Sequence, residues 1–592
     1  YANDLCSVYS INVKNLSYKY YPENMSNSYT FPFSWHDIDW RKTRSKVSYY
    51  QNQLAVAELK GNSGLVTTLQ RNLVKSFAGR ALAVRVIASN KGKNTPGVDG
   101  VIWDTSDKKM DAIYRLGEVR NYRCSPVRRV YIPKPGGKLR PLGIPNMYDR
   151  GLQYLWKLAL DPIAECRADR HSYGFRKGRS TQDVQTIMHL LLSPSSRCDW
   201  VLEADIKGFF DNINHAWIMQ NIPMDKDILL EWLKAGALEI PSQEFHKGVA
   251  GVPQGGPISP LIANMTLDGL QGWVNSSVKH LHKKSRVTSW SPKVNVIRYA
   301  DDFVVTASTK RILDKIVKLA VQDFLTLRGL ELNHEKSCIT SVKKGFDFVG
   351  FHFRVYPDKS GPKGAKSIVK PTIEGKKRLR SKIKDVVKLN RSSGEIIKDL
   401  NPILRGWANY YKATSAKTSF TSIGKYLWDK TWTWAKRKHR TFNFHDLAER
   451  FYTRRGKRRW IFKGELMSKE LTVFLIDRVA IKRHSLARDY NPYLLDNEDY
   501  FLKRDKRLTS SYLWNEKKRK LLNRDKYKCR ICNEYICSED IVEIHHIKPR
   551  RLGGNDSITN SVVLHVECHK QLTHTKSRSL LAQFRREQIL DD

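Results

Sequence analysis

Three aspartates in two distant segments are the residues best suited to holding divalent metal ions. Asp205 follows the apolar run 201–204, and Asp301 and Asp302 interrupt the apolar runs on either side of them. Adjacent carboxylates repel each other unless cations neutralise them. Nucleotidyl transfer to a 3′ hydroxyl uses two divalent cations about 3.5–4 Å apart, held by carboxylates of this kind. The flanks predict strand ends that present the three side chains together, whereas an Asp-Asp pair alone would fit a polar turn.

A second group of metal ligands lies near the C-terminus. Two pairs of soft or borderline ligands have the spacing of a tetrahedral Zn²⁺ site, and they are Cys529, Cys532, His565 and Cys568. Between and beside these pairs lie His545, His546, Asn560 and His569. A structural zinc ribbon that binds DNA without cutting it is the alternative, and it leaves His545, His546 and Asn560 without a role.

The composition points to a multidomain protein with a polyanionic partner. The 592 residues carry 104 Lys and Arg against 59 Asp and Glu, a net charge of +45, and 41% of them are hydrophobic. A chain this apolar builds real cores, so its charge sits on folded surfaces. The sequence contains no apolar run of about 20 residues, which argues against a membrane partner and against secretion. Nine cysteines with one Cys-x-x-Cys pair favour a reducing compartment and a metal site over a disulfide framework.

The elements that must position the aspartates can be placed approximately. Apolar spacing predicts two helices over 47–89, broken at residues 61–64, and another helix over 149–165. Residues 131–145 read as a strand, a Pro-Gly-Gly turn and a second strand. Lys134, Lys138 and Arg140 project from this hairpin, where they could touch phosphates. The turn at residues 253–256 contains Gln254, which offers amide hydrogen bonds, and Gly255, which lets the backbone approach a base or nucleotide.

Residues 371–460 differ from the rest in charge and aromatic content. They hold 24 Lys and Arg against 7 Asp and Glu, interleaved with aromatic residues such as Trp407, Trp428, Trp432 and Trp434. Basic helices with aromatic platforms are typical of nucleic-acid binding. The alternative is that the tryptophans form a core and the charges form a solvated face.

The sequence around the aspartates resembles the right-hand polymerase palm of the reverse transcriptases. Tyr299-Ala-Asp301-Asp302 matches their Tyr-x-Asp-Asp signature, and residues 91–100, 131–145, 172–180 and 251–260 resemble successive blocks of group II intron-encoded proteins. The resemblance implies that Asp205 and Asp301 bind two Mg²⁺ ions and that Asp302 completes the carboxylate cluster. It also implies that Phe210 excludes a ribose 2′-hydroxyl, so that the substrates are deoxynucleoside triphosphates.

The same resemblance extends to the residues that would contact substrate. Arg140 matches a residue of the family's fingers that contacts the incoming triphosphate, and Lys134 or Lys138 could assist it. Lys336 lies where the family has a lysine near the triphosphate, although a plain surface lysine fits nearly as well. Residues 400–412 resemble the thumb and maturase domain, which implies binding to the intron RNA that encodes the protein.

The C-terminal segment resembles an HNH nuclease, a zinc-stapled ββα-metal module. By this resemblance His546 is the general base, while His545 and His569 bind the divalent metal of the nuclease. Asn560 would orient the base or assist the metal site. Many relatives have a cysteine at the position of His565, and histidine can also bind zinc.

These readings together predict an α+β multidomain fold. We place an unassigned extension at 1–40, reverse transcriptase fingers and palm at 41–365, and an α-helical thumb and maturase domain at 366–460. A basic DNA-binding connector then covers 461–520, and the HNH module covers 521–592. The expected partners are intron RNA, target DNA, deoxynucleoside triphosphates and a second copy of the chain in a homodimer.

The predicted function is that of a mobile group II intron protein. It would copy intron RNA into DNA, assist splicing and nick target DNA. A splicing-only RNA-binding maturase is the main alternative, and intact catalytic positions argue against it. A reverse transcriptase of a defence or diversity system fits the palm but not the thumb or the HNH module. The initial Tyr1 fits a frame that runs in from upstream sequence. The composition fits a plastid, a mitochondrion or a bacterial cytoplasm, with the plastid ahead of the mitochondrion.

Overall fold

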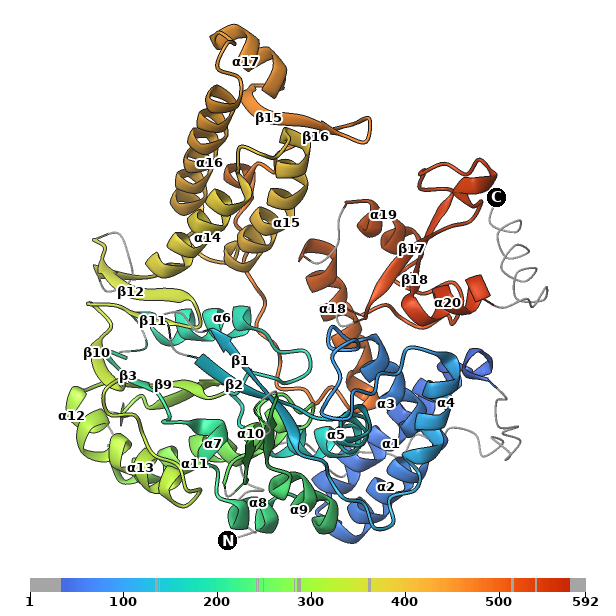
Figure 1. Ribbon diagram of the computed structural model, residues 1–592. Helices are drawn as coiled ribbons and strands as arrows, with labels where there is room; N and C mark the ends of the chain where they lie inside the picture. The colour runs from blue at the N-terminus through green and yellow to red at the C-terminus, as the bar shows by residue number, and fades with distance from the viewer. Residues whose placement is uncertain are drawn as a thin grey trace.

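The computed structural model describes residues 34–574, except for 134–136, 138, 195, 197, 241, 243, 249, 282, 285–288, 360–363, 513–515 and 538–539. Lys134, Lys138 and most of the N-terminal extension therefore lie outside the described residues. A large body carries the fingers and palm, a helical thumb rises from it, and the C-terminal module lies beside the first helices (Figure 1).

The N-terminal helices form one flank of the large body. They are α1 (Trp40–Leu59), α2 (Ser63–Lys75), α3 (Phe77–Ser89), α4 (Ser106–Arg115) and α5 (Met147–Arg167). The predicted break after α1 and the predicted helix over 149–165 are confirmed. The predicted second helix is divided, because Ser76 has an extended backbone and its side chain accepts a hydrogen bond from the Gly79 N–H. A serine in this role starts a new helix.

The palm is a four-stranded antiparallel sheet in the order β10-β3-β9-β8. Its strands are β3 (Trp200–Ala204), β8 (Asn295–Tyr299), β9 (Asp302–Ala307) and β10 (Cys338–Ser341). The central strand β9 is buried at every position after Asp302. The predicted hairpin around Asp301 is confirmed, and the apolar strands on both sides of the aspartates form its core.

The fingers carry a second four-stranded sheet in the order β2-β1-β4-β5. Its strands are β1 (Val127–Pro133), β2 (Leu139–Ile144), β4 (Ala237–Glu239) and β5 (Glu244–His246). Strands β1 and β2 form the predicted hairpin, with Ile132 opposite Arg140.

Short helices and strands complete the large body. They are α6 (Thr181–Leu191), α7 (Phe209–Asn212), α8 (His215–Asn221), α9 (Lys226–Lys234), α10 (Ser259–Leu267), α11 (Leu270–Ser277), β6 (Lys283–Lys284), β7 (Ser289–Trp290), α12 (Lys310–Ile312) and α13 (Lys318–Thr326), then the sheet β11 (Phe346–Phe348), β12 (Phe351–Pro357) and β13 (Ala365–Pro371). The last sheet leads directly into the thumb (Figure 1).

The thumb contains four helices and a small antiparallel sheet. Its elements are α14 (Ile373–Val386), α15 (Ser393–Tyr411), α16 (Lys417–Lys438), α17 (Phe444–Phe451), β14 (Tyr452–Arg455), β15 (Arg458–Leu466) and β16 (Lys469–Thr472). The sequence analysis did not predict this sheet. The boundary placed between residues 460 and 461 falls inside β15, which pairs with β14 before it and with β16 after it.

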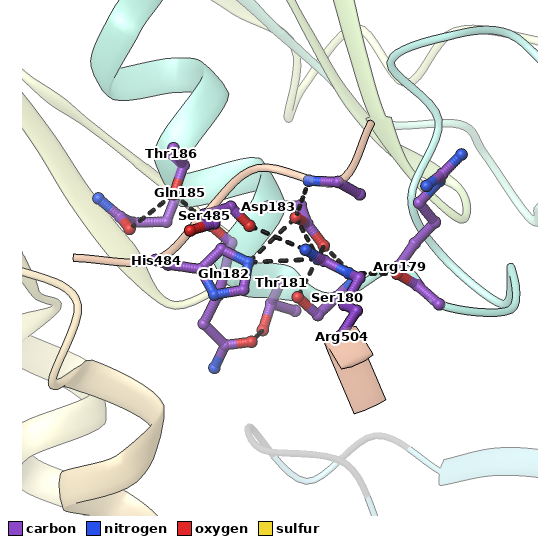
Figure 2. A network of polar contacts seen from close by, with 12 residues as sticks. Arg179, Ser180, Thr181, Gln182, Asp183, Gln185, Thr186, His484, Ser485 and Arg504 are labelled. Atoms are coloured by element: carbon purple, nitrogen blue, oxygen red, sulfur yellow. Dashed lines mark hydrogen bonds and ion pairs between the residues drawn. The ribbon is translucent and has the colours of Figure 1, made fainter. Parts of the chain in front are cut away.

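The connector, residues 473–512, runs from the thumb back across the palm to the C-terminal module. Its last helix is α18 (Glu498–Tyr512). Asp183, at the start of α6, holds the connector in place (Figure 2). Its fully buried carboxylate accepts hydrogen bonds from Arg504, from the His484 ring and from the Ala487 N–H. Burial alone would raise the pKa of Asp183, but the hydrogen bond from His484 and the charge of Arg504 outweigh burial and lower it.

The C-terminal module has a ββα core. It consists of α19 (Glu516–Arg524), the antiparallel pair β17 (Val542–His546) and β18 (Ser561–His565), and α20 (Val566–His574). The module contacts α1 and the turn before it through several polar contacts, including hydrogen bonds from the Gln571 amide to the carbonyls of His36 and Ile38. Arg44 of α1 lies 2.9 Å from Asp540, and the Trp35 indole donates to Glu567 at 3.0 Å.

Within the described residues, every helix is too short or too polar to cross a lipid bilayer.

The Asp183 contacts make a prediction about stability. In Asp183→Ala the buried Arg504 side chain loses its charge partner, and breaking such a pair costs about 3–5 kcal/mol. We expect chemical denaturation to show this loss and limited proteolysis to cleave the connector faster. Asp314→Ala, which removes an exposed carboxylate, serves as the control. Equal protease resistance of Asp183→Ala and Asp314→Ala would show that Asp183 does not hold the connector.

Candidate active sites

The palm sheet brings the three predicted carboxylates together. Ala204 of β3 pairs with Phe303 of β9, so Asp205 just beyond β3 lies next to Asp302 at the start of β9. Tyr299 pairs with Asp302 across a tight turn, and Ala300 in this turn has a φ of +58°. The turn therefore places Asp301 at the same end of the palm sheet as the other two aspartates, near enough to Asp302 to act on its charge.

The electrostatics of this cluster suit the binding of cations. The pKa of Asp302 is raised to about 6, first by desolvation in the cluster and then by the charges of Asp301 and Asp205. Lys336 acts in the opposite direction. Negative groups that raise one another's pKa are stabilised when a cation binds them. The oxygen donors and their charge therefore fit Mg²⁺.

A buried arginine holds the turn that carries Asp301. Arg298 is 1% exposed, and its guanidinium pairs with Asp268 and donates to the side chain of Asn264 at 3.1 Å and to the carbonyl of Ala300 at 3.4 Å. The sequence analysis missed this residue, because an arginine in a strand gives no sign of facing a core.

The segment from residue 172 to 180 packs against the same turn. At Gly174 a Cβ atom would lie 2.3 Å from the Ala300 backbone nitrogen, so only glycine permits this approach. Tyr173 donates its N–H to the carbonyl of Arg298 at 3.0 Å. The sequence block at 172–180 thus has a structural use, which is to support the aspartate turn.

The predicted Pro-Gln-Gly-Gly loop joins the fingers to the palm. The Gly143 N–H of β2 donates to the Gln254 carbonyl at 2.6 Å. Gly255 has a φ of +129°, and a Cβ atom there would lie 2.2 Å from the Gly143 carbonyl oxygen. The Val252 N–H donates to the carbonyl of Phe210, whose ring is half-buried. Among the described residues, the side-chain amide of Gln254 makes no hydrogen bond and is available to a substrate.

The predicted basic residues differ in how the structure places them. The Lys336 ammonium lies 3.1 Å from Asp205, so this lysine belongs to the carboxylate cluster. The Asn333 amide also donates to Asp205 at 3.0 Å, a contact that the sequence analysis did not predict. Arg140 is exposed on β2, three residues before the Gly143 contact with the loop.

The C-terminal module gathers the four predicted zinc ligands. The ligand atoms of Cys529, Cys532, His565 and Cys568 all lie within 4.8 Å of one another. Three of these side chains are buried, and the His565 Nδ1 atom lies 3.3 Å from the Cys532 sulfur. The other ring nitrogen of His565 lies 3.4 Å from Asp540, the carboxylate that pairs with Arg44. Carboxylates commonly orient metal-binding histidines in this way, so the donor set fits a metal ion.

The predicted nuclease ligands also meet. The rings of His545 and His569 lie 5.0 Å apart in an edge-to-face arrangement. His569 Nδ1 contacts Glu543 at 2.6 Å, so its Nε2 atom is the one left for a metal. Burial, with the neighbouring histidines, lowers the pKa of His545 to about 4, and a neutral imidazole is the form that binds metals.

A carboxylate that the sequence analysis missed contacts the predicted general base. Asp556 lies 2.9 Å from His546 Nε2, and it also pairs with Lys469 of the thumb hairpin at 2.8 Å. Asn560 stabilises the loop that connects it to His546. Its side chain accepts from the Lys548 N–H at 2.7 Å and donates to the Asn555 carbonyl at 2.7 Å.

The raised pKa of Asp302 predicts a pH-dependent stability. The folded pKa of about 6 lies above the ordinary value of 3.8, so the carboxyl favours folding when protonated and this contribution is lost as pH rises through 6. Without divalent metal, Asp302→Asn should raise the melting temperature near pH 8 and raise it much less near pH 4. The surface variant Asp323→Asn is the control. An equal gain at both pH values would contradict the assigned repulsion.

Four segments of the chain match known domain families. Residues 35–116 match the N-terminal domain of reverse transcriptase, and residues 132–353 match the reverse transcriptase (RNA-dependent DNA polymerase) domain. Residues 376–453 match the group II intron maturase-specific domain, and residues 529–575 match the HNH endonuclease.

Three relatives show how far the similarity extends. Protein YkfC of Escherichia coli is 33% identical over 340 residues, which cover 51% of this chain and 87% of that protein. The group II intron-encoded protein LtrA of Lactococcus lactis is 29% identical over 417 residues, 56% of this chain and 68% of LtrA. The putative COX1/OXI3 intron 1 protein of Saccharomyces cerevisiae is 23% identical over 566 residues, 81% of this chain and 64% of that protein. The order of the four domains and these relatives show that the chain belongs to the group II intron-encoded proteins that carry reverse transcriptase, maturase and HNH endonuclease domains.

Proposed function

We propose that this protein is a multifunctional enzyme of a mobile group II intron. It copies intron RNA into DNA, assists the splicing of that RNA and nicks target DNA with its HNH module. The observation that carries the proposal is the carboxylate cluster of Asp205, Asp301 and Asp302. Desolvation and the charges of Asp301 and Asp205 raise the pKa of Asp302, and Lys336 pairs with Asp205. A splicing-only protein would have no use for this repulsion.

The polymerase step is the attack of a primer 3′ oxygen on the α-phosphorus of a deoxynucleoside triphosphate, with pyrophosphate leaving. Two Mg²⁺ ions held by Asp205 and Asp301 would stabilise the attacking and leaving oxygens. Asp302 completes the negative site. Lys336, whose ammonium lies 3.1 Å from Asp205, would contact the triphosphate bound there. Gln254 offers its amide to the base pair being formed, and Arg140 together with Lys138 contacts the triphosphate.

Phe210 selects the sugar of the incoming nucleotide. Its backbone carbonyl is fixed by the Val252 N–H at 2.7 Å, and its ring contacts Phe209 at 5.3 Å between centroids. A ring held by its backbone and by a neighbouring ring can exclude a ribose 2′-hydroxyl, so the product is DNA.

The nuclease step is hydrolysis of a DNA phosphodiester. His546 takes the proton from the attacking water, and Asp556 orients its imidazole. A divalent metal bound by His545 and His569 would stabilise the departing 3′ oxygen. Asn560 acts as a positioning residue, since its side chain fixes the loop that follows His546. Cys529, Cys532, His565 and Cys568 would hold a structural Zn²⁺, which would stabilise this small module.

The thumb and the connector supply the nucleic-acid surfaces. The thumb helices carry 15 of the 24 Lys and Arg residues of 371–460. They bind intron RNA, which keeps the enzyme on the RNA that it helps to fold. The connector, fixed to the palm at Asp183, faces target DNA. Both contacts should weaken steeply with salt, because phosphate binding releases counterions.

Removal of one palm carboxylate should abolish DNA synthesis. Asp301→Asn leaves a similar volume but removes a metal-binding charge, so we expect primer extension on an RNA template to fall by at least about a hundredfold. The same preparation should nick target DNA at the wild-type rate. Primer extension that persists in Asp301→Asn would refute the site.

Removal of the nuclease base should have the opposite effect. His546→Ala should slow nicking of target DNA by about 10²–10⁴-fold, the usual contribution of a general base, and leave primer extension near the wild-type rate. His334→Ala, which changes a histidine near the palm, is the matched control for nicking. Loss of both activities in His546→Ala would mean that the two modules do not work independently.

A further inference from the structure

A cavity in the thumb lies apart from both catalytic centres. It has a volume of about 320 Å³ and lies between α16, the start of β15 and residues 473–477. This is within the range of pockets that hold small ligands, about 300–1,000 Å³. Its floor includes apolar residues such as Leu427 and Phe462, while Trp428 and Trp460 form part of its rim.

The two rim tryptophans are exposed although the thumb has a well-packed aromatic core. Trp428 is 38% exposed and Trp460 is 39% exposed, whereas the core residue Trp434 is 3% exposed. Trp432 stacks against Trp428 with centroids 5.9 Å apart and an angle of 6° between the rings, and it meets the Trp460 ring edge-on at 6.1 Å. Trp432 thus supports both rim rings from behind, and the core does not need their exposed surfaces.

The backbone at Trp460 is also unusual for a bulky residue. Its φ is +65°, in the left-handed region that side chains rarely adopt. Such strained conformations cluster at ligand-binding and active-site positions. The conformation places this indole on the rim of the cavity rather than in the regular alternation of β15.

Positive charge surrounds the cavity. Lys425 and Arg459 line it and are exposed, and neither forms an ion pair within the part of the chain that the structure describes. The acidic lining residue, Asp477, is already paired with Arg458 at 3.2 Å. The site therefore combines free cations with exposed indole surfaces, which is the combination that binds single-stranded nucleic acid.

We propose that this cavity binds an unpaired nucleobase of the intron RNA, stacked on the exposed face of the Trp428 indole and meeting the Trp460 indole edge-on, with the flanking phosphates at Lys425 and Arg459. The inference rests on the proposed maturase function and assigns it a specific pocket. A base within a duplex cannot enter, because its faces are already stacked on its neighbours. The pocket thus selects a looped-out or single-stranded position of the RNA.

The test uses the full-length protein and a short single-stranded oligoribonucleotide with 2-aminopurine at its centre, beside the matching duplex. Wild type should quench the fluorescence of the single strand and should bind it more tightly than the duplex. Trp428→Ala should weaken binding about 5- to 150-fold, equivalent to about 1–3 kcal/mol of base stacking. Trp460→Ala, which removes the edge-on contact, should weaken binding less but still measurably. Trp460→Phe should restore most of the quenching.

The controls separate the pocket from general RNA binding. Trp273→Ala removes an exposed tryptophan from α11 and should leave affinity and quenching unchanged. Lys425→Ala should reduce the salt dependence of binding by about one phosphate contact. Wild-type affinity and quenching in folded Trp428→Ala and Trp460→Ala would overturn the pocket, and so would equal binding of single strand and duplex. Failure of wild type to bind RNA at all would instead overturn the maturase function.

Discussion

The repulsion among three carboxylates at the end of the palm sheet is the constraint on which the rest of this structure depends. Asp205, Asp301 and Asp302 come from two antiparallel strands and a turn, and each must stay close to the others despite its charge. Desolvation, and then the charges of Asp301 and Asp205, raise the pKa of Asp302. The surrounding structure has to hold the carboxylates in place until cations neutralise them.

The palm meets this constraint with buried polar contacts around the turn. Arg298 ties the turn to α10 and its following residues through Asn264 and Asp268, and Gly174 lets a neighbouring segment pack directly on the turn. The fingers are tied to the same region by the Gly143–Gln254 contact. The residues proposed to bind substrate on the fingers and those proposed to bind metal on the palm therefore belong to one connected structure.

The nuclease module is also connected to the polymerase. Arg44 of α1 pairs with Asp540 next to His565, the proposed zinc ligand, and Lys469 of the thumb pairs with Asp556 next to His546, the proposed general base. Asp183 holds the connector that links the thumb to the module (Figure 2). These contacts connect the nuclease module to the fingers, the palm and the thumb.

The sequence predicted the local parts of this structure better than the long-range ones. The aspartate hairpin, the fingers hairpin and the Cys/His cluster follow from residue patterns whose partners are close in sequence or have fixed metal-ligand spacing. The contacts of Asn333, Arg298, Asp556 and Asp183 could not be predicted, because their partners lie on other elements and polar residues of these types usually face solvent. The thumb sheet was missed because basic residues obscure the alternation of its strands.

The number of divalent metal ions bound by each variant tests the central claim most directly. Mn²⁺ binding to the full-length protein can be counted by electron paramagnetic resonance with template, primer and an incoming deoxynucleotide present. The account predicts that Asp301→Asn loses two ions relative to wild type, while His569→Ala loses a different, single ion. An unchanged number of ions in Asp301→Asn would contradict the claim that these carboxylates form a two-metal polymerase site.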